Sequence, residues 1–178
     1  AIDKAWHLGA TPVTASDSSG YVVDDEGIQT DLLRQLKEID RVRISEYVKY
    51  RPTARFVEGE RPWSVPVDVA IPSATQNELD EDDARTLVAG GVRVVAEGAN
   101  MPSTPGAVAI FQEADVLFGP GKAANAGGVA TSALEMSQNA ARQRWSFADS
   151  EAKLQAIMRD VHDAAFHAAE KYGRPGDY

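Results

Sequence analysis

The stretch "VDVAIPSATQNELDEDDARTLVAGGVRVVAEGA", residues 67–99, alternates between two kinds of sequence pattern. Two nearly continuous apolar runs, 67–74 and 92–99, flank a segment, 77–91, that opens with carboxylates and closes with two glycines. Apolar runs of this length are typical of strands that are buried on both faces. Acidic residues at the start and glycine at the end are the order that a helix favours. The stretch therefore predicts a strand, a helix and a second strand.

The same alternation extends to both sides of this stretch. Three further apolar runs, predicted as strands, occupy residues 11–16, 54–59 and 115–120. Two helical faces are expected from apolar residues spaced at helical intervals: Ile28, Leu32, Leu33, Leu36 and Ile39, then Leu154, Ile157, Met158, Val161 and Ala165. Alternating strands and helices predict one α/β domain with a mainly parallel sheet over residues 1–178.

The composition excludes several classes of protein. Of the 178 residues, 43% are hydrophobic and 25% are charged, which is the balance of a globular domain. No apolar run approaches the roughly 20 residues that a membrane helix needs, and a net charge of −9 repels nucleic acid and anionic lipid. The absence of cysteine excludes disulfides, thiolate zinc sites and cysteine nucleophiles. We therefore expect a cytoplasmic protein with no nucleic-acid partner and no membrane partner.

The residues that usually bind metal ions are poorly placed for that role. His162 and His167 are five positions apart, so on a helix they point about 140° away from each other. His7 stands alone, and the acidic residues in 79–83 are expected to interact with a helix dipole rather than with a cation. The sequence therefore predicts no metal site.

The loops that follow the predicted strands share an unusual composition. They are "SDSSG" (16–20), "SATQN" (73–77), "EGANMPST" (97–104) and "GPGKAANAGG" (119–128), all rich in small residues, amides and hydroxyls. Loops often contain such residues for turn formation alone. Four of them at the carboxyl edge of one sheet, where such sheets bind ligands, predict a groove that suits the sugar and amide of a cofactor.

Four motifs carry a resemblance to a known family. They are "TASDSSG" (14–20), "PWSVPVDVAIPSATQNELD" (62–80), "VAEGANMPST" (95–104) and "GPGKAANAGGVATSALEMSQN" (119–139). In this order and spacing they resemble the cofactor-binding domain of hexameric glutamate dehydrogenases, which are members of the Glu/Leu/Phe/Val dehydrogenase family. The resemblance is closest to the bacterial, NADP-using type, and it covers essentially the whole chain.

The resemblance implies a Rossmann-like, doubly wound sheet with helices on both faces, truncated at its N-terminal end. In the family the first strand and the Gly-rich phosphate loop lie immediately before the point that matches Ala1. The catalytic lysine and aspartate belong to another domain, so no catalytic residue is expected in this chain and the isolated fragment is expected to be inactive. The parent would be a homohexamer that converts L-glutamate reversibly to 2-oxoglutarate and ammonia by hydride transfer to the nicotinamide.

The resemblance also implies roles for individual residues. Five positions match the nicotinamide end of the family's cofactor site: Ala74, Thr75, Gln76, Asn100 and Asn125. Two match residues that face the substrate: Val129 and Ser132. The Ser132 hydroxyl would bind the side-chain carboxylate of glutamate. Asn125, Val129, Ser132 and Met136 recur at helical spacing, which predicts a single ligand-facing stripe.

The loop after the first predicted strand bears on the choice of cofactor. NAD-binding proteins generally place an acid here, whereas a 2′-phosphate requires hydroxyls and cations. The residues predicted to bind this end of the cofactor are Ser16, Asp17, Ser18, Ser19, Arg43 and Lys49. NADP is therefore expected in preference to NAD, although a carboxylate at Asp17 would repel a phosphate. Arg43 and Lys49 are alternatively interpreted as solvated helix charges.

Two other functions are consistent with the same residues. The chain could be part of another amino-acid dehydrogenase of the same family, or a non-catalytic domain that binds nucleotides or other proteins. A Gly-rich loop and a lysine-bearing domain upstream of this sequence would distinguish an enzyme from a non-catalytic domain. Within the family, a larger effect of Ser132→Ala on the Michaelis constant for glutamate than on that for norvaline would indicate a glutamate dehydrogenase.

Overall fold

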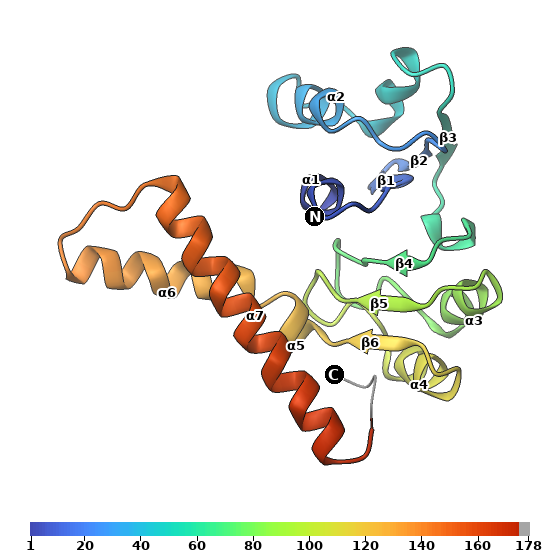
Figure 1. The fold of residues 1–178 in the computed structure, drawn as a ribbon. Coiled ribbons are helices and arrows are strands. Elements are labelled where there is room, and N and C mark those ends of the chain that lie inside the picture. Colours follow the sequence, from blue (N-terminus) through green and yellow to red (C-terminus); the bar gives the residue numbers. More distant parts are fainter. Residues whose placement is uncertain (175–178) are drawn as a thin grey trace. The chain divides into compact units, whose positions relative to one another are not determined.

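The computed structural model describes residues 1–174 and divides the chain into two compact units, Ala1–Val65 and Pro66–Tyr178 (Figure 1). Residues 175–178, the end of the predicted domain, lie outside the described residues. Each unit has its own three-stranded sheet. The strands therefore lie in two sheets rather than in one.

The first unit is built around an antiparallel sheet with the strand order β1-β2-β3. Its strands are β1 (Thr14–Asp17), β2 (Gly20–Val23) and β3 (Arg55–Glu58). Its helical elements are short: α1 (Ile2–His7), α2 (Thr30–Arg34), the π-helical turn η1 (Gln35–Ile39) and the 3-10 helices η2 (Ile44–Lys49) and η3 (Pro62–Ser64).

A tight hairpin joins β1 to β2. Asp17 pairs with Gly20, so Ser18 and Ser19 alone form the turn. A connection of two residues joins only antiparallel strands, which makes the prediction of a mainly parallel sheet wrong for this unit. Gly20 has a φ of +141°, and a side chain at this position would collide with the backbone of β3. Glycine is required because the two strands approach each other so closely here.

The core of the first unit confirms most of the predicted helical face over 28–39. Four of its five residues belong to the buried cluster or pack against it: Ile28, Leu32, Leu33 and Leu36. Ile39 is 69% exposed, so the prediction is wrong for this residue. A π-helical turn contains more residues than an α-helical turn, and over Gln35–Ile39 it rotates Ile39 away from the buried face.

A buried ionic network follows β2. The carboxylate of Asp24 is fully buried and accepts hydrogen bonds from Arg51 Nε at 2.8 Å, from Tyr47 Oη at 3.2 Å and from Thr53 Oγ1 at 3.2 Å. Burial opposes the ionisation of Asp24, but the Arg51 guanidinium and the other hydrogen bonds outweigh it and lower the pKa of this carboxyl. The network ties the end of β2 to the segment that leads into β3.

The second unit contains a parallel sheet, as predicted. The strands β4 (Val69–Ala70), β5 (Val94–Ala96) and β6 (Leu117–Gly119) pair in this order. The helices α3 (Glu81–Ala89) and α4 (Pro105–Glu113) connect them. These two helices pack side by side, and α4 also packs on β6 (Figure 1). The strand, helix and second strand predicted within 67–99 are therefore confirmed, with shorter bounds.

The acidic cluster in 79–83 starts α3. Asp80 is the N-cap, and its carboxylate accepts hydrogen bonds from the backbone N–H groups of Asp82 at 3.0 Å and Asp83 at 3.1 Å. The Asp83 carboxylate accepts the backbone N–H of Asp80 in return. This capping box satisfies the free donors of the first turn, so the predicted helix-start role of these acids is confirmed. Within residues 1–174, no group of three His, Asp or Glu side chains is arranged to hold a metal ion.

Three helices follow β6: α5 (Gly121–Ala124), α6 (Gly127–Ala140) and α7 (Phe147–Lys171). α7 crosses α6 and packs against it (Figure 1). The second predicted helical face, over 154–165, is half-buried along α7 and is therefore confirmed. Among the helices of residues 1–174, none combines the length and the apolar character that crossing a membrane requires.

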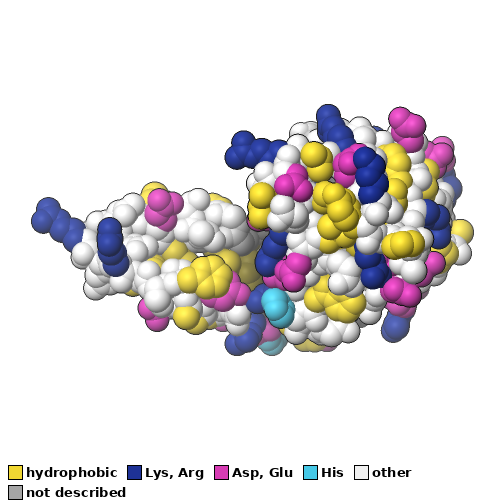
Figure 2. All heavy atoms as spheres, turned by 90° about the horizontal axis from the view of Figure 1, so that it is seen from above, with side chains coloured by type: hydrophobic (Ala, Val, Ile, Leu, Met, Phe, Trp, Pro, Cys, Tyr) yellow, Lys and Arg dark blue, Asp and Glu magenta, His cyan; other side chains and the backbone are white. Residues whose placement is uncertain are grey.

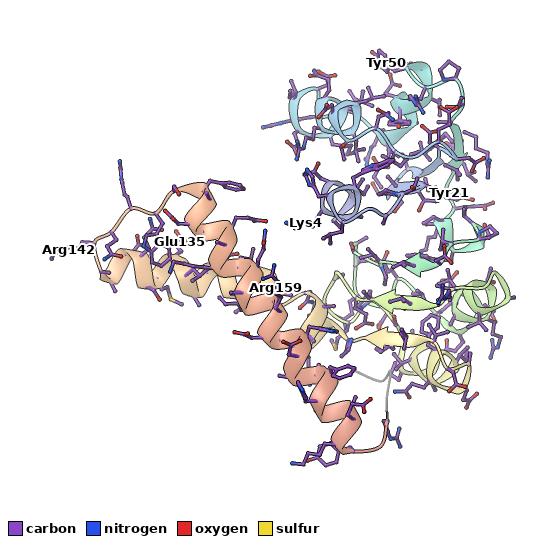
Figure 3. The ribbon with its side chains drawn as sticks, viewed as in Figure 1. Lys4, Tyr21, Tyr50, Glu135, Arg142 and Arg159 are labelled. Atoms are coloured by element: carbon purple, nitrogen blue, oxygen red, sulfur yellow. The ribbon has the colours of Figure 1, made fainter. Side chains whose placement is uncertain are left out.

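The hairpin of α6 and α7 also exposes apolar side chains. Val129 is 71% exposed, Met136 66% and Phe147 84%. Figure 2 shows hydrophobic and charged side chains interspersed on this hairpin. Glu135 projects from α6 and Arg142 from the turn that follows it (Figure 3). The surface of the hairpin is thus of mixed character, with charges of both signs.

Candidate functional site

The parallel sheet brings three loops to one edge. The strands β4, β5 and β6 run in the same direction, so their carboxyl ends meet there. The segments 71–79, 97–104 and 120–126 follow them. Open α/β sheets bind their ligands outside this edge. All five residues predicted to bind the nicotinamide end of a cofactor lie in these three segments.

The loops after β4 and β5 are hydrogen-bonded to each other. The backbone N–H of Gly98 donates to the oxygen of Pro72 at 2.9 Å, and the N–H of Asn77 donates to the oxygen of Met101 at 3.0 Å. Between these two bonds, three predicted site residues are exposed: Ala74, Thr75 and Gln76. The backbone N–H of Ala74 donates to the carboxylate of the buried Glu78 at 2.8 Å, which fixes the start of this exposed segment.

The loop after β6 is joined to the loop after β5 through Asn125. Its side-chain Nδ2 donates to the backbone oxygen of Ala99 at 2.8 Å. Ala99 directly precedes Asn100, whose side chain is exposed. The structure therefore brings the two asparagines predicted to bind the nicotinamide to neighbouring positions on the edge of the sheet.

The side chain of Glu97 also connects the loops after β5 and β6. Sequence reasoning did not identify this residue. It is 5% exposed, its Oε2 accepts the backbone N–H of Gly121 at 2.7 Å, and its Oε1 accepts the N–H of Ser103 at 3.2 Å. An acidic residue at the end of an apolar strand, directly before a Gly-Ala-Asn turn, was the available signal. A buried carboxylate needs such partners, because burying it unpaired is costly.

The predicted substrate residues lie at the beginning of α6. Val129 is 71% exposed, and the exposed Ser132 donates its hydroxyl hydrogen bond to the backbone oxygen of Gly128 at 3.3 Å. Asn125 ends the separate helix α5, so the prediction of one continuous helical stripe from Asn125 is wrong. The break occurs because Asn125 and Ala126 form the short turn that redirects the chain. Val129, Ser132 and Met136 remain a shared exposed stripe of α6.

A cavity of about 240 Å³ lies between α6 and α7. Thr131, Leu134, Trp145 and Phe147 are among the residues that line it. The predicted substrate residues Val129 and Ser132 are not among its lining residues in the described part of the chain. This cavity therefore reflects the packing of the helical hairpin and not the candidate site.

In the first unit, both carboxylate oxygens of Asp17 accept hydrogen bonds from other groups of the protein. Its Oδ1 accepts the backbone N–H of Ser19 at 2.8 Å and the Ser19 hydroxyl at 2.6 Å. Its Oδ2 accepts Lys37 Nζ at 2.6 Å and the backbone N–H of Ile44 at 3.0 Å. Partial burial opposes ionisation, but these hydrogen bonds outweigh it and hold the pKa of Asp17 far below its usual range. Sequence reasoning missed Lys37, which lies twenty residues away on η1.

Arg43, one of the two predicted cations, lies beside the hairpin turn. Arg43 Nη1 donates a hydrogen bond to the hydroxyl of Ser18. Lys49, the other predicted cation, makes an ion pair with Glu46 at 2.5 Å. Ser16 lies on β1, paired with Tyr21 of β2. The structure therefore brings Asp17, Ser18, Ser19 and Arg43 together, and it adds Lys37 to the group.

Comparison with known proteins identifies the family. The family model for Glutamate/Leucine/Phenylalanine/Valine dehydrogenase matches residues 1–176. The NADP-specific glutamate dehydrogenase of Salmonella typhi is 56% identical over 175 residues, and that of Escherichia coli K12 is 53% identical over 180 residues. These alignments cover 97% and 99% of this chain but 38% and 39% of the relatives, so the chain spans well under half of their length.

A solved structure gives the same result for the fold. The crystal structure of Plasmodium falciparum glutamate dehydrogenase matches with a TM-score of 0.92 and 43% identity, over 97% of this chain and 38% of that one. The resemblance drawn from the four sequence motifs is thereby confirmed. This chain belongs to the Glutamate/Leucine/Phenylalanine/Valine dehydrogenase family.

Proposed function

We propose that this chain is the cofactor-binding part of an NADP-dependent glutamate dehydrogenase. The parent enzyme would catalyse the reversible oxidative deamination of L-glutamate to 2-oxoglutarate and ammonia. One observation carries the proposal: the hydrogen bond from Asn125 to Ala99 brings Asn125 and Asn100 together beside the exposed segment 74–76. The names of the relatives, NADP-specific glutamate dehydrogenases, support the choice of reaction.

The donor set at the sheet edge fits a nicotinamide and its ribose. It combines side-chain amides from Asn100, Asn125 and Gln76 with a hydroxyl from Thr75, and small residues around them leave room for a ligand. Amides both donate and accept hydrogen bonds, which suits a carboxamide and ribose hydroxyls. When bound, the nicotinamide accepts or returns the hydride. The residues of this chain would orient the ring and its ribose at the edge of the sheet.

The hairpin turn in the first unit supports NADP over NAD. The carboxylate of Asp17 faces Lys37 and two backbone N–H groups, so its charge is matched within the protein. The Ser18 hydroxyl and the Arg43 guanidinium then provide the donors that a 2′-phosphate requires. Lys49 would contribute a second positive charge, which is paired with Glu46. In this arrangement Asp17 orders the phosphate site instead of binding a ribose hydroxyl.

Val129 and Ser132 would face the substrate from α6. The Ser132 hydroxyl would donate to the side-chain carboxylate of glutamate, and this contact would discriminate against apolar amino acids, since an unpaired buried carboxylate is costly. We further propose a Rossmann-like, doubly wound domain with helices on both faces, in a cytoplasmic homohexamer.

Steady-state kinetics of the full-length protein test this function. We expect turnover with L-glutamate and NADP, a kcat/KM for NADP at least tenfold above that for NAD, and weak activity with L-leucine. A preference for leucine or another apolar amino acid would show a different specificity within the family. The absence of any amino-acid-dependent reduction of either nucleotide would contradict an enzymatic role and favour a non-catalytic nucleotide-binding domain.

A further inference from the structure

Among the described residues of the second unit, Glu97 is the most deeply buried acid, and its two carboxylate oxygens bind different loops. Oε2 accepts the N–H of Gly121 at 2.7 Å, twenty-four residues away along the chain. Oε1 accepts the N–H of Ser103 at 3.2 Å, at the far end of the loop that carries Asn100. One side chain thus holds both loops that carry the predicted nicotinamide-binding asparagines.

The contact at Gly121 is close and is transmitted directly to Asn125. A Cβ at position 121 would lie 3.0 Å from the Ala99 oxygen and 3.3 Å from Glu97 Oε2, so there is little room for any side chain there. Asn125 donates its backbone N–H to the oxygen of Gly121 at 3.1 Å, across the single turn of α5. A shift of Gly121 away from Glu97 would therefore move Asn125 as well.

Building on the proposed function, we propose that Glu97 is a positioning residue for the nicotinamide end of the cofactor site. Each oxygen of Glu97 already accepts a backbone N–H group and the side chain is buried, so we assign it an indirect role through the two loops rather than a direct contact with the ligand. It acts by fixing the distance between the loop of Asn100 and the loop of Asn125. Hydrogen bonds to a charged group are about twice as strong as neutral ones, which suits this task.

The variant Glu97→Gln tests the proposal in the full-length protein. The amide keeps the size of the side chain but places an NH₂ group against one of the two backbone N–H donors, so one loop is released. We expect the Kd for NADPH to rise about tenfold, the equivalent of one charge-assisted hydrogen bond. The KM for glutamate should change less than the KM for NADPH.

A second ligand distinguishes a positioning role of Glu97 from a general loss of structure in the variant. Adenosine 2′,5′-bisphosphate carries the 2′-phosphate but no nicotinamide, so its Kd should be unchanged in Glu97→Gln. Weaker binding of both ligands, or of neither, would overturn the positioning role. The matched control is Glu113→Gln, an exposed glutamate at the end of α4, which should leave both constants unchanged.

Two other results are possible, one for the wild-type protein and one for the folding of the variant. If the wild-type protein binds neither NADPH nor the bisphosphate, the proposed function itself fails. If Glu97→Gln does not fold, Gly121→Ala replaces it, because the added methyl group pushes against the Ala99 oxygen and the Glu97 carboxylate. The same selective loss of NADPH binding is expected for Gly121→Ala, and an equal loss of both ligands would overturn the proposal.

Discussion

The side-chain amide of Asn125 donates a hydrogen bond of 2.8 Å to the backbone oxygen of Ala99. This bond joins two loops that follow neighbouring strands of the parallel sheet, although the two residues are 26 positions apart. It also places Asn125 beside Asn100. The geometry of the proposed nicotinamide site depends on this contact.

Replacing Asn125 with alanine should therefore damage cofactor use. In the full-length protein we expect kcat/KM for NADPH to fall at least tenfold, because both a proposed ligand contact and the bond to Ala99 are lost. The matched control is Asn139→Ala, an exposed asparagine near the end of α6, which should have no effect. Equal kinetics in the two variants would remove Asn125 from the site.

Arg43→Ala should reduce cofactor discrimination. Without the guanidinium beside Ser18, the 2′-phosphate loses its closest proposed cation, whereas NAD lacks that phosphate. We expect the Kd for NADP to rise at least tenfold and the Kd for NAD to remain unchanged, as measured by titration calorimetry. A parallel loss for both nucleotides would contradict a phosphate-binding role.

Lys49→Ala should weaken NADP binding less than Arg43→Ala does in the same titration. Lys49 is paired with Glu46 and lies on an exposed surface, where ion pairs are weak. A loss of NADP affinity of about twofold to threefold is expected, because the charge of Lys49 is exposed and already paired with Glu46. A larger effect than that of Arg43→Ala would reverse the assignment of the two cations.

Asp24 should make the first unit sensitive to acid. Its pKa is lowered in the folded state, so its contribution to stability is complete above the unfolded pKa of about 3.9 and is lost as the pH falls below that value. Asp24→Asn should destabilise the unit by about 3 kcal/mol near neutral pH, because Arg51 loses its buried partner. Hydrogen exchange of peptides from 14–58, at pH 7 and in acid, measures this loss of stability of the first unit.

The control for that experiment is the neighbouring residue. Asp25 is 80% exposed and lies 3.7 Å from Arg55, so Asp25→Asn should change the protection of the same peptides very little. If both variants behave alike, the network around Asp24 does not determine the stability of this unit.

Ser132→Ala should act on the substrate rather than on the cofactor. Without the hydroxyl, the KM for glutamate should rise at least tenfold, whereas the KM for norvaline, which has no side-chain carboxylate, should change little. Ser137→Ala on the same helix is the matched control, since this exposed serine also bonds only a backbone oxygen of its own helix. Equal changes for the two amino acids would place Ser132 outside the substrate site.

Local patterns predicted the elements that depend on near neighbours. The order of charges around Asp80 and Gly91 predicted α3, because caps and dipoles act within one helical turn. The apolar runs predicted β4, β5 and β6, and the sheet-edge rule then predicted that the loops 73–77, 97–104 and 119–128 would meet. The rule was wrong for the fourth loop, 16–20, which is a hairpin turn in the separate antiparallel sheet. The loops that carry Asn100 and Asn125 were predicted in this way, and the family resemblance supplied the roles proposed for these two residues.

Contacts between distant residues were beyond the reach of local patterns. The sequence by itself determined the family, the parallel sheet of the second unit and the loops that bear the proposed site. Only the tertiary structure decided that β2 returns antiparallel beside β1, that Lys37 neutralises Asp17, and that Glu97 ties Ser103 to Gly121. The reason is physical: periodicity and capping are set within a few residues, whereas the partner of a buried or half-buried charge is whichever donor the fold brings within hydrogen-bonding distance.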